Sequence, residues 1–224
     1  GETITTAGSP FYNLTFDSAD ATGGWTLQDD MKVTGAFTVT NGVFISGANT
    51  VLLEGASATY LGSNITVANT NWTNGTLNIQ SDTDQTFPSN EAYNNLQIGR
   101  VAGTGTTIYT MGSSVTISGT WTIDSDAKVS LTPDATGVNK VYDGTTDATV
   151  NISGIGGVSG FYEDFSYNYT AAFVDKNVGT GKTVNVTGIS LSGTDASKYQ
   201  LSSTTDSTTA NITVKGLSIT ASNQ

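Results

Sequence analysis

The sequence predicts an all-β protein, and three observations lead to that prediction. Apolar and polar residues alternate with a period of two in several short runs, most clearly at 33–39 and 115–123. Gly is abundant (26) and Pro scarce (3), while Thr, Ser and Asn recur throughout. Long Ala/Leu/Glu/Lys tracts at helical spacing are absent. Because apolar residues make up only 36% of the 224 residues, thin sheets or a narrow solenoid suit the chain better than one broad core.

The first region, residues 1–133, has the rhythm of short strands separated by turns. Dipeptides such as Asn41-Gly42 and Asn74-Gly75 supply the turn signals. Besides the two long runs, shorter apolar runs lie at 11–16, 43–45, 51–53, 65–67, 77–79 and 128–131. Thr, Ser and Asn suit exposed sheet faces and tight turns.

An internal repeat suggests that these strands stack. Residues 12–16 match residues 94–98 with an offset of 82, and Gly35 aligns with Gly119 at an offset of 84. A β-solenoid coil takes on the order of 20–30 residues, so one offset corresponds to about three or four coils. We therefore predict a β-solenoid for this region; the alternative is a β-sandwich with an internal duplication.

The same region resembles stretches of filamentous-haemagglutinin-like and autotransporter-like surface proteins, in residues such as 33–42 (VTGAFTVTNG). That resemblance implies a right-handed parallel β-helix on the outside of a bacterial cell.

The second region, 134–215, follows a junction expected at Pro133-Asp134 and the polar residues after it. Strands are expected near 141 and at 149–152, 165–173, 183–186, 189–191, 199–202 and 210–214. Asp195 and Tyr199 have the spacing of a tyrosine corner, which is a mark of immunoglobulin-like sandwiches. We predict such a sandwich here, with a β-grasp fold as the alternative.

Three motifs in this region resemble the YDG module of large bacterial surface proteins. They are Tyr142-Asp143-Gly144, the run FVDKNVG at 173–179 and the run DASKY at 195–199. The resemblance implies a location and an architecture but no reaction. Residues 216–224 form a further alternating strand, which would be a donor strand for a neighbour or the start of a next module.

Composition excludes several classes of function. The net charge of −11, without a Lys/Arg cluster, argues against nucleic acid and against an anionic membrane surface. No apolar run is long enough to span a membrane. Without His or Cys, the usual general base, thiol nucleophile and zinc ligands are missing, so we expect no enzyme.

Divalent cations, neutral glycans and further copies of the chain are the partners that the charge allows. Asp-x-Asp pairs in loops can supply oxygen ligands for calcium. The first candidates for a calcium site are Asp82, Asp84, Asp124 and Asp126.

Candidate contact residues lie in an aromatic cluster and at the two ends of the chain. The aromatic candidates are Tyr162, Tyr167 and Tyr169, and the candidates for strand pairing are Ile4, Leu217 and Ile219. We expect an extracellular, non-enzymatic structural protein of a bacterial surface that forms a stalk, fibre or adhesin by head-to-tail β-strand association. The alternatives are one segment of a longer repeat array, and an adhesin module that binds glycans or a host surface, with or without calcium.

Overall fold

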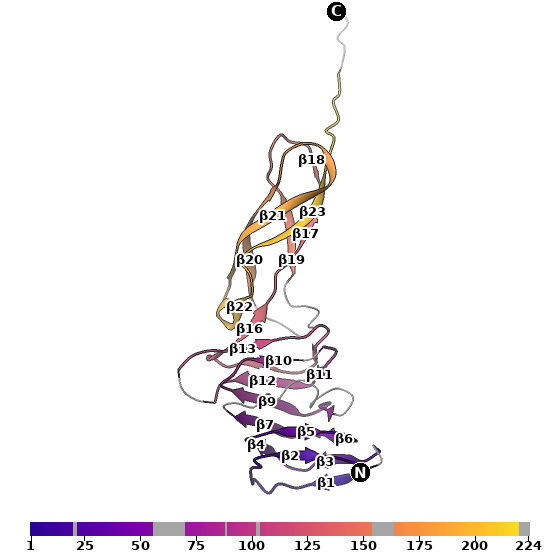
Figure 1. Ribbon diagram of the computed structural model, residues 1–224, viewed down its shortest axis with the longest axis vertical. Coiled ribbons are helices and arrows are strands. Elements are labelled where there is room, and N and C mark those ends of the chain that lie inside the picture. Colours follow the sequence, from indigo (N-terminus) through magenta and orange to yellow (C-terminus); the bar gives the residue numbers. More distant parts are fainter. Residues whose placement is uncertain (20–21, 56–69, 88, 102–103, 154–163, 220–224) are drawn as a thin grey trace, which may run out of the picture. The chain divides into compact units, whose positions relative to one another are not determined.

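The computed structural model describes residues 1–19, 22–55, 70–87, 89–101, 104–153 and 164–219 (Figure 1). Strands account for 54% of the described residues, and these residues contain one 3-10 helix, η1 (Ala196–Lys198), so the all-β prediction is confirmed. Contacts divide the described chain into two compact units. The first contains residues 1–131, 164 and 195–200, and the second contains residues 132–153, 165–194 and 201–219. Within these residues, no helix is long and apolar enough to cross a membrane.

The first unit is a β-solenoid of about five turns, whose coils run past three sides. Short strands make up the first side: β1 (Glu2–Ile4), β3 (Gly24–Leu27), β6 (Val43–Ile45), β8 (Thr70–Asn71), β11 (Ala92–Tyr93) and β14 (Thr116–Ile117). On this side the ladder is interrupted, because β8 and β11 belong to separate sheets.

The second side is one continuous sheet, and the third holds two sheets. The second consists of β4 (Met31–Val33), β7 (Thr50–Gly55), β9 (Thr76–Ser81), β12 (Asn95–Gly99) and β15 (Trp121–Ile123). The third consists of β2 (Leu14–Phe16), β5 (Phe37–Val39), β10 (Gln85–Thr86), β13 (Thr107–Thr110), β16 (Ala127–Leu131) and β22 (Tyr199–Leu201).

Successive coils pair in parallel. Val51 lies opposite Leu77, and Leu77 lies opposite Leu96, so these two coils are 26 and 19 residues long. Hairpins would give antiparallel neighbours, and the alternative of a duplicated sandwich is therefore wrong for this region. The unequal coil lengths explain why the repeat in the sequence drifts from 82 to 84 residues.

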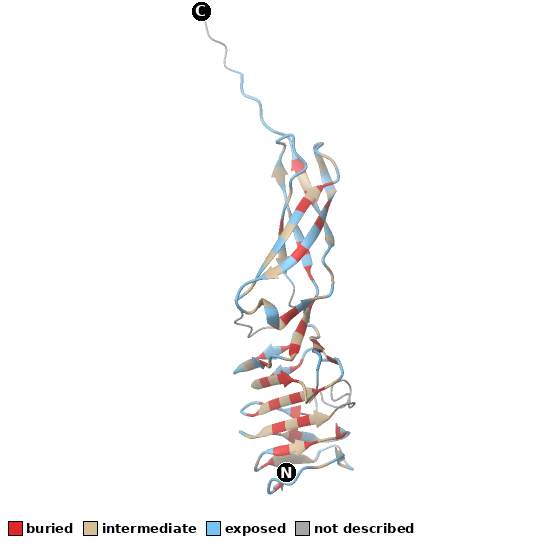
Figure 2. Cartoon of the chain, turned by 90° about the vertical axis from the view of Figure 1, so that its left-hand side faces the viewer, coloured by how far each residue is buried: buried red, intermediate tan, exposed pale blue. Residues whose placement is uncertain are grey.

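The solenoid core is built from the inward residue of each alternating pair, which gives the buried stripes in Figure 2. Aromatic rings form a chain of contacts through this core, with centroids 5.1 to 6.4 Å apart. In order of contact they are Trp25, Phe16, Phe44, Trp72, Tyr93, Phe87 and Tyr109. Trp72 and Tyr109 are therefore core residues.

Two runs that alternate without interruption in the sequence each turn a corner of the solenoid. Run 33–39 ends β4 and begins β5, and run 115–123 contains β14 and β15. The corners lie at Gly35 and Gly119. A Cβ at Gly35 would lie 2.3 Å from the Tyr12 carbonyl oxygen, and one at Gly119 would lie 2.4 Å from Asn95 Oδ1. Both positions therefore require glycine for lack of space.

The second unit packs two sheets over one core. The four-stranded sheet has the order β18 (Lys140–Val141), β23 (Asp206–Thr213), β21 (Gly179–Ser192), β20 (Ser166–Phe173), and the second sheet pairs β17 (Asp134–Val138) with β19 (Thr149–Ser153). Ala135 and Val150 of the small sheet share a core with Phe173, Val184 and Ile212 of the large one. This arrangement is compatible with the predicted sandwich.

Three expectations for this part of the chain differ from the structure in detail. The division between the two units lies between residues 131 and 132, next to the junction expected at Pro133-Asp134, but the residues after it form strand β17, antiparallel to β19. The separate strands expected at 183–186 and 189–191 are one strand, β21, because Gly188 (φ +65°) lies in a bulge rather than a break. Tyr199 lies on β22, next to β16 in the first unit, and does not belong to the sandwich core, so it is no tyrosine corner of that sandwich.

Candidate functional site

Side chains at the solenoid corners join one coil to the next. Asn13 Oδ1 accepts the backbone N–H of Ala36 at 2.7 Å, and Asn95 Oδ1 accepts that of Thr120 at 2.8 Å. Carboxylates do the same: Asp29 accepts the N–H of Thr6 at 2.8 Å. These bonds satisfy backbone donors where the chain turns and the strand ladder is absent. The backbone bond to Thr6 is the first cause that lowers the pKa of Asp29.

The four aspartates predicted as calcium ligands fall in two places of the solenoid. Asp82 forms an ion pair with Arg100, with Oδ1 3.1 Å from Nε, and Asp84 accepts the N–H of Ile108 at 2.8 Å. Asp124 and Asp126 flank the turn into β16. Nowhere in the described part of the chain do three acidic side chains gather in a metal-binding group.

Asp124 belongs to a polar ladder on the outer face of the second side. Gln80 Nε2 donates to Asp124 Oδ2 at 3.0 Å, and Gln97 Nε2 lies 3.2 Å from both carboxylate oxygens. Gln97 Oε1 accepts in turn from Asn78 at 3.2 Å. Gly99 lies beneath these side chains, and a Cβ on it would lie 2.3 Å from Asp124 Oδ2. Glycine at this position keeps the amides and the carboxylate in contact.

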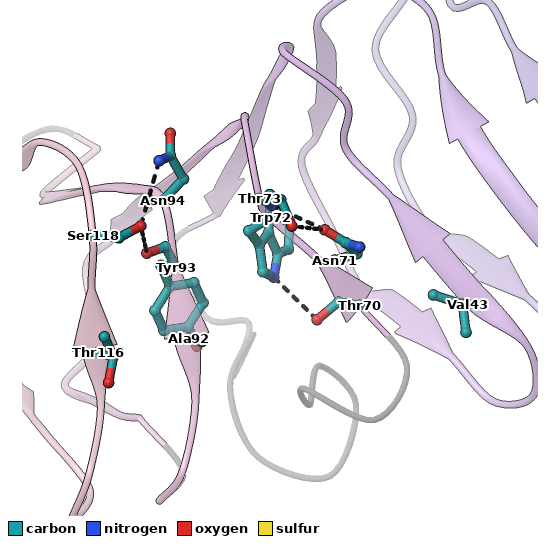
Figure 3. Close-up of a pocket in the computed structure, with 10 residues that line it drawn as sticks. All are labelled: Val43, Thr70, Asn71, Trp72, Thr73, Ala92, Tyr93, Asn94, Thr116 and Ser118. Atoms are coloured by element: carbon teal, nitrogen blue, oxygen red, sulfur yellow. Dashed lines mark hydrogen bonds between the residues drawn. The ribbon is translucent and has the colours of Figure 1, made fainter.

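A notch of about 460 Å³ lies where the ladder of the first side is interrupted (Figure 3). Trp72 and Tyr93 form its floor and are each 2% exposed. Trp72 Nε1 donates to Thr70 Oγ1 at 3.0 Å, and Asn94 Nδ2 donates to Ser118 Oγ at 3.4 Å. Hydroxyls and amides therefore line this hollow. Burial is the main cause that raises the pKa of Tyr93.

The YDG signature is a turn held by one lysine. Lys140 Nζ donates to Asp143 Oδ1 at 2.9 Å, to the Thr145 carbonyl at 2.9 Å and to the Asp147 carbonyl at 2.8 Å. Asp143 Oδ1 also accepts the Thr145 N–H at 2.9 Å. Gly144 has φ +86°, which explains a glycine in the turn. The Lys140 hydrogen bond is the first cause that lowers the pKa of Asp143 to about 2.

The aspartates of the other two motifs also form ion pairs with a lysine. Asp175 pairs with Lys182 and accepts the Asn177 N–H at 2.8 Å. Asp195 pairs with Lys198 at 3.0 Å. The sequence interpretation named these motifs but missed the pairs. The spacing of three residues between Lys140 and Asp143, and between Asp195 and Lys198, was a signal for two of them.

The aromatic contact candidates are not a free surface patch. Tyr167 and Tyr169 are half-buried against the core of the second unit. The Tyr169 hydroxyl donates to the Val150 carbonyl at 2.6 Å, and burial raises the pKa of Tyr167. Tyr162 lies outside the described residues.

The three strand-pairing candidates lie at sheet edges or beyond them. Ile4 is on β1, which has a described partner, β3, on one side only. Leu217 and Ile219 follow β23 and are 86% and 85% exposed. We name residues 214–219 the tail. All three of its apolar side chains, Val214, Leu217 and Ile219, are exposed.

The comparison with protein families matches residues 126–209 to the YDG domain. The chain therefore carries this domain towards its C-terminal end, as the motifs predicted, and the match begins at the turn into the last solenoid strand, β16. No curated protein and no solved structure matches the chain.

Proposed function

We propose that this protein is an extracellular structural component of a bacterial surface, which builds a stalk or filament by end-to-end β-strand association. The observation that carries the proposal is the tail. Leu217 and Ile219 alternate with polar residues and are 86% and 85% exposed, whereas Ala210 and Ile212 of the preceding strand β23 are buried. Residues 214–219 belong to no strand of the structure, unlike the strand expected from 216 onward. An extended segment with this alternation can add to an exposed sheet edge.

The solenoid supports the same proposal. Its coils are joined by backbone ladders and by corner side chains such as Asn13 and Asp29. Such a stack is stiff along its axis and adds length with each coil. The resemblance to filamentous-haemagglutinin-like proteins fits this role and is part of the proposal. Contacts between unlike ends that do not close into a ring produce filaments.

The test compares the chain with a variant that lacks residues 216–224. The full chain should sediment as concentration-dependent polymers and form fibres in electron micrographs. The shortened variant should remain monomeric with an unchanged circular dichroism spectrum. Polymers that persist after the deletion would contradict the role of the tail, and a full chain that is monomeric at every concentration would contradict the proposal itself.

The notch of Figure 3 favours glycan binding as a second candidate function. Its lining of Asn71, Thr73, Asn94 and Ser118 presents hydroxyls and amides beside the rings of Trp72 and Tyr93, and these polar groups can form hydrogen bonds with the hydroxyls of a sugar. A glycan array, read with and without a calcium chelator, tests this candidate. Specific binding that Asn94→Ala abolishes would support it, and an array without specific signals would exclude it.

A further inference from the structure

The third motif of the YDG domain lies in the solenoid unit. The matched range, 126–209, contains all three motifs, but residues 195–200 belong to the first unit together with residues 1–131. The motifs at 142–144 and 173–179 belong to the second unit. Tyr199, the last residue of the third motif, is 3% exposed and does not belong to the buried core of the second unit. The family domain is therefore divided between the two units.

The first strand of the family domain is also the last coil strand of the solenoid. β16 begins one residue after the start of the match and pairs in parallel with β13, which lies outside it. Across this boundary Thr107 lies opposite Ala127, and Tyr109 lies opposite Val129. Tyr109 and Val129 are both 0% exposed. The backbone ladder and the buried core of the solenoid thus continue into the family domain without a break.

The third motif leads into the strand that covers the far edge of β16. The sheet has the order β10, β13, β16, β22, so β22 pairs with the edge of β16 that faces away from β13. An uncovered edge would present a row of unpaired N–H and C=O groups, and short edge strands limit this hazard. β22 has three residues, against five in β16. Ser197 and Gln200 are exposed, and a polar outer face is what the terminal repeat of a stacked protein requires.

Local hydrogen bonds hold the motif in place before β22 begins. The Asp164 N–H donates to Asp195 Oδ2 at 2.9 Å, and the Asp195 N–H donates to the Asp164 carbonyl at 3.1 Å. Asp195 also pairs with Lys198 at 3.0 Å across η1. All three residues belong to the first unit. The charged residues of the motif therefore fix the turn that brings Tyr199 to the solenoid.

We infer that the YDG domain docks on a parallel β-solenoid and ends it. β16 supplies the strand of the final coil, and residues 195–201, which we name the cap, cover its edge. The partner that this surface fits is the edge of a solenoid coil, which β13 provides in this chain. The inference goes beyond the proposed function and does not depend on it. It implies that the solenoid is closed to strand addition at β16.

Hydrogen exchange read by mass spectrometry tests the role of the cap in the full chain. Tyr199→Ala removes the buried ring of the cap and should speed amide exchange in residues 107–131 roughly tenfold, while β19 and β21 keep their rates. Tyr169→Ala is the matched control, because Tyr169 is half-buried against the core of the second unit. It should speed exchange in β19 and β21 and leave residues 107–131 unchanged. The same pattern in Tyr199→Ala would overturn the inference.

A milder variant keeps the test decisive if Tyr199→Ala does not fold. Tyr199→Leu retains an apolar side chain at the buried position and should give a smaller increase in the same place, residues 107–131. Unchanged exchange of these residues in Tyr199→Leu, with a circular dichroism spectrum like that of the unmodified chain, would show that the cap does not stabilise the last coil.

Self-association tests whether the cap covers an edge. Tyr199→Ala is introduced into the chain that lacks residues 216–224, so that the tail cannot contribute to assembly. An uncovered β16 edge should then pair with a second copy, and sedimentation should show dimers that increase with concentration. Tyr169→Ala in the same background should remain monomeric. A monomeric Tyr199→Ala chain, or equal association of both variants, would contradict the covering role. A full chain that never polymerises contradicts the proposed function and leaves this inference standing.

Discussion

The Asn13 side chain accepts the backbone N–H of Ala36, 23 residues further along the chain, at 2.7 Å. Asn95 makes the equivalent bond to Thr120 at 2.8 Å. The two asparagines are the aligned residues of the internal repeat, yet β2 after Asn13 lies on the third side of the solenoid and β12 after Asn95 lies on the second. The two matching segments therefore share the same corner structure, although they lie at different corners of the solenoid.

Replacing either asparagine by alanine should destabilise the first unit. Asn13→Ala and Asn95→Ala each leave a backbone N–H without its acceptor, at a cost of about 1–2 kcal/mol. All three tryptophans lie within residues 1–131, so tryptophan fluorescence during urea unfolding reports on this unit. Asn94→Ala is the control, because its bond to Ser118 is 3.4 Å long and exposed. Equal losses in all three variants would contradict the corner role.

Gly35 should tolerate no side chain. In Gly35→Ala the new Cβ would lie 2.3 Å from the Tyr12 carbonyl oxygen, and the backbone must move, which costs about 1–3 kcal/mol. Gly216→Ala is the matched control, because nothing lies within 4 Å of its Cβ and its φ is not positive. Urea midpoints of the two variants check this, and a Gly35→Ala midpoint equal to that of Gly216→Ala would refute the steric argument.

The local parts of the fold could be predicted from the sequence. Alternation and turn dipeptides give the strands, and the aligned Asn13 and Asn95 with Gly35 and Gly119 give the stacking. The positions of the corners could not be predicted. The alternation of apolar and polar residues continues through Gly35 and Gly119, while the backbone passes there from one side of the solenoid to the next. The cause is a steric limit from the preceding coil, which no local pattern encodes.

Partners between coils could not be predicted for a related reason. Asp82 and Asp84 look like a ligand pair in sequence, but coil lengths of 19 to 26 residues decide that Asp82 faces Arg100 and that Asp84 faces Ile108. A one-residue change in coil length would move every outward side chain to a different neighbour. The Lys140 and Asp143 pair, in contrast, is local and was accessible from spacing alone.

The ion pair of Asp82 and Arg100 should contribute to stability more than an exposed pair. Their side chains are 21% and 16% exposed, so solvent screens them less than Lys32 and Glu54, which are 41% and 29% exposed. A double-mutant cycle with Asp82→Asn and Arg100→Met should give a coupling of about 1 kcal/mol, against about 0.3 kcal/mol for the second pair. Urea unfolding of the variants measures both, and equal couplings would contradict the difference in screening.

Acid should weaken the second unit through the YDG turn. The pKa of Asp143 is lowered from 3.8 to about 2, first by the hydrogen bond from Lys140, and the pKa of Asp175 is lowered by Lys182. A carboxyl whose folded pKa lies below its unfolded pKa binds protons more readily when unfolded. Its stabilisation is complete above pH 4 and is lost as the pH falls towards 2. The melting temperature of the second unit should fall across this window.

Replacing Lys140 tests whether the loss of stability in acid comes from the Asp143 carboxylate in this turn or from protonation elsewhere in the chain. In Lys140→Met the Asp143 carboxyl loses its ammonium partner, so its pKa should rise towards 3.8, and the pH dependence of melting between 4 and 2 should become shallower. A titration of the Asp143 carboxyl carbon by NMR measures the pKa directly. Lys215→Met removes the same charge from the tail, away from the turn, and should leave the Asp143 pKa near 2. An Asp143 pKa that stays near 2 in Lys140→Met would show that the Thr145 N–H, rather than the lysine, holds the carboxylate ionised.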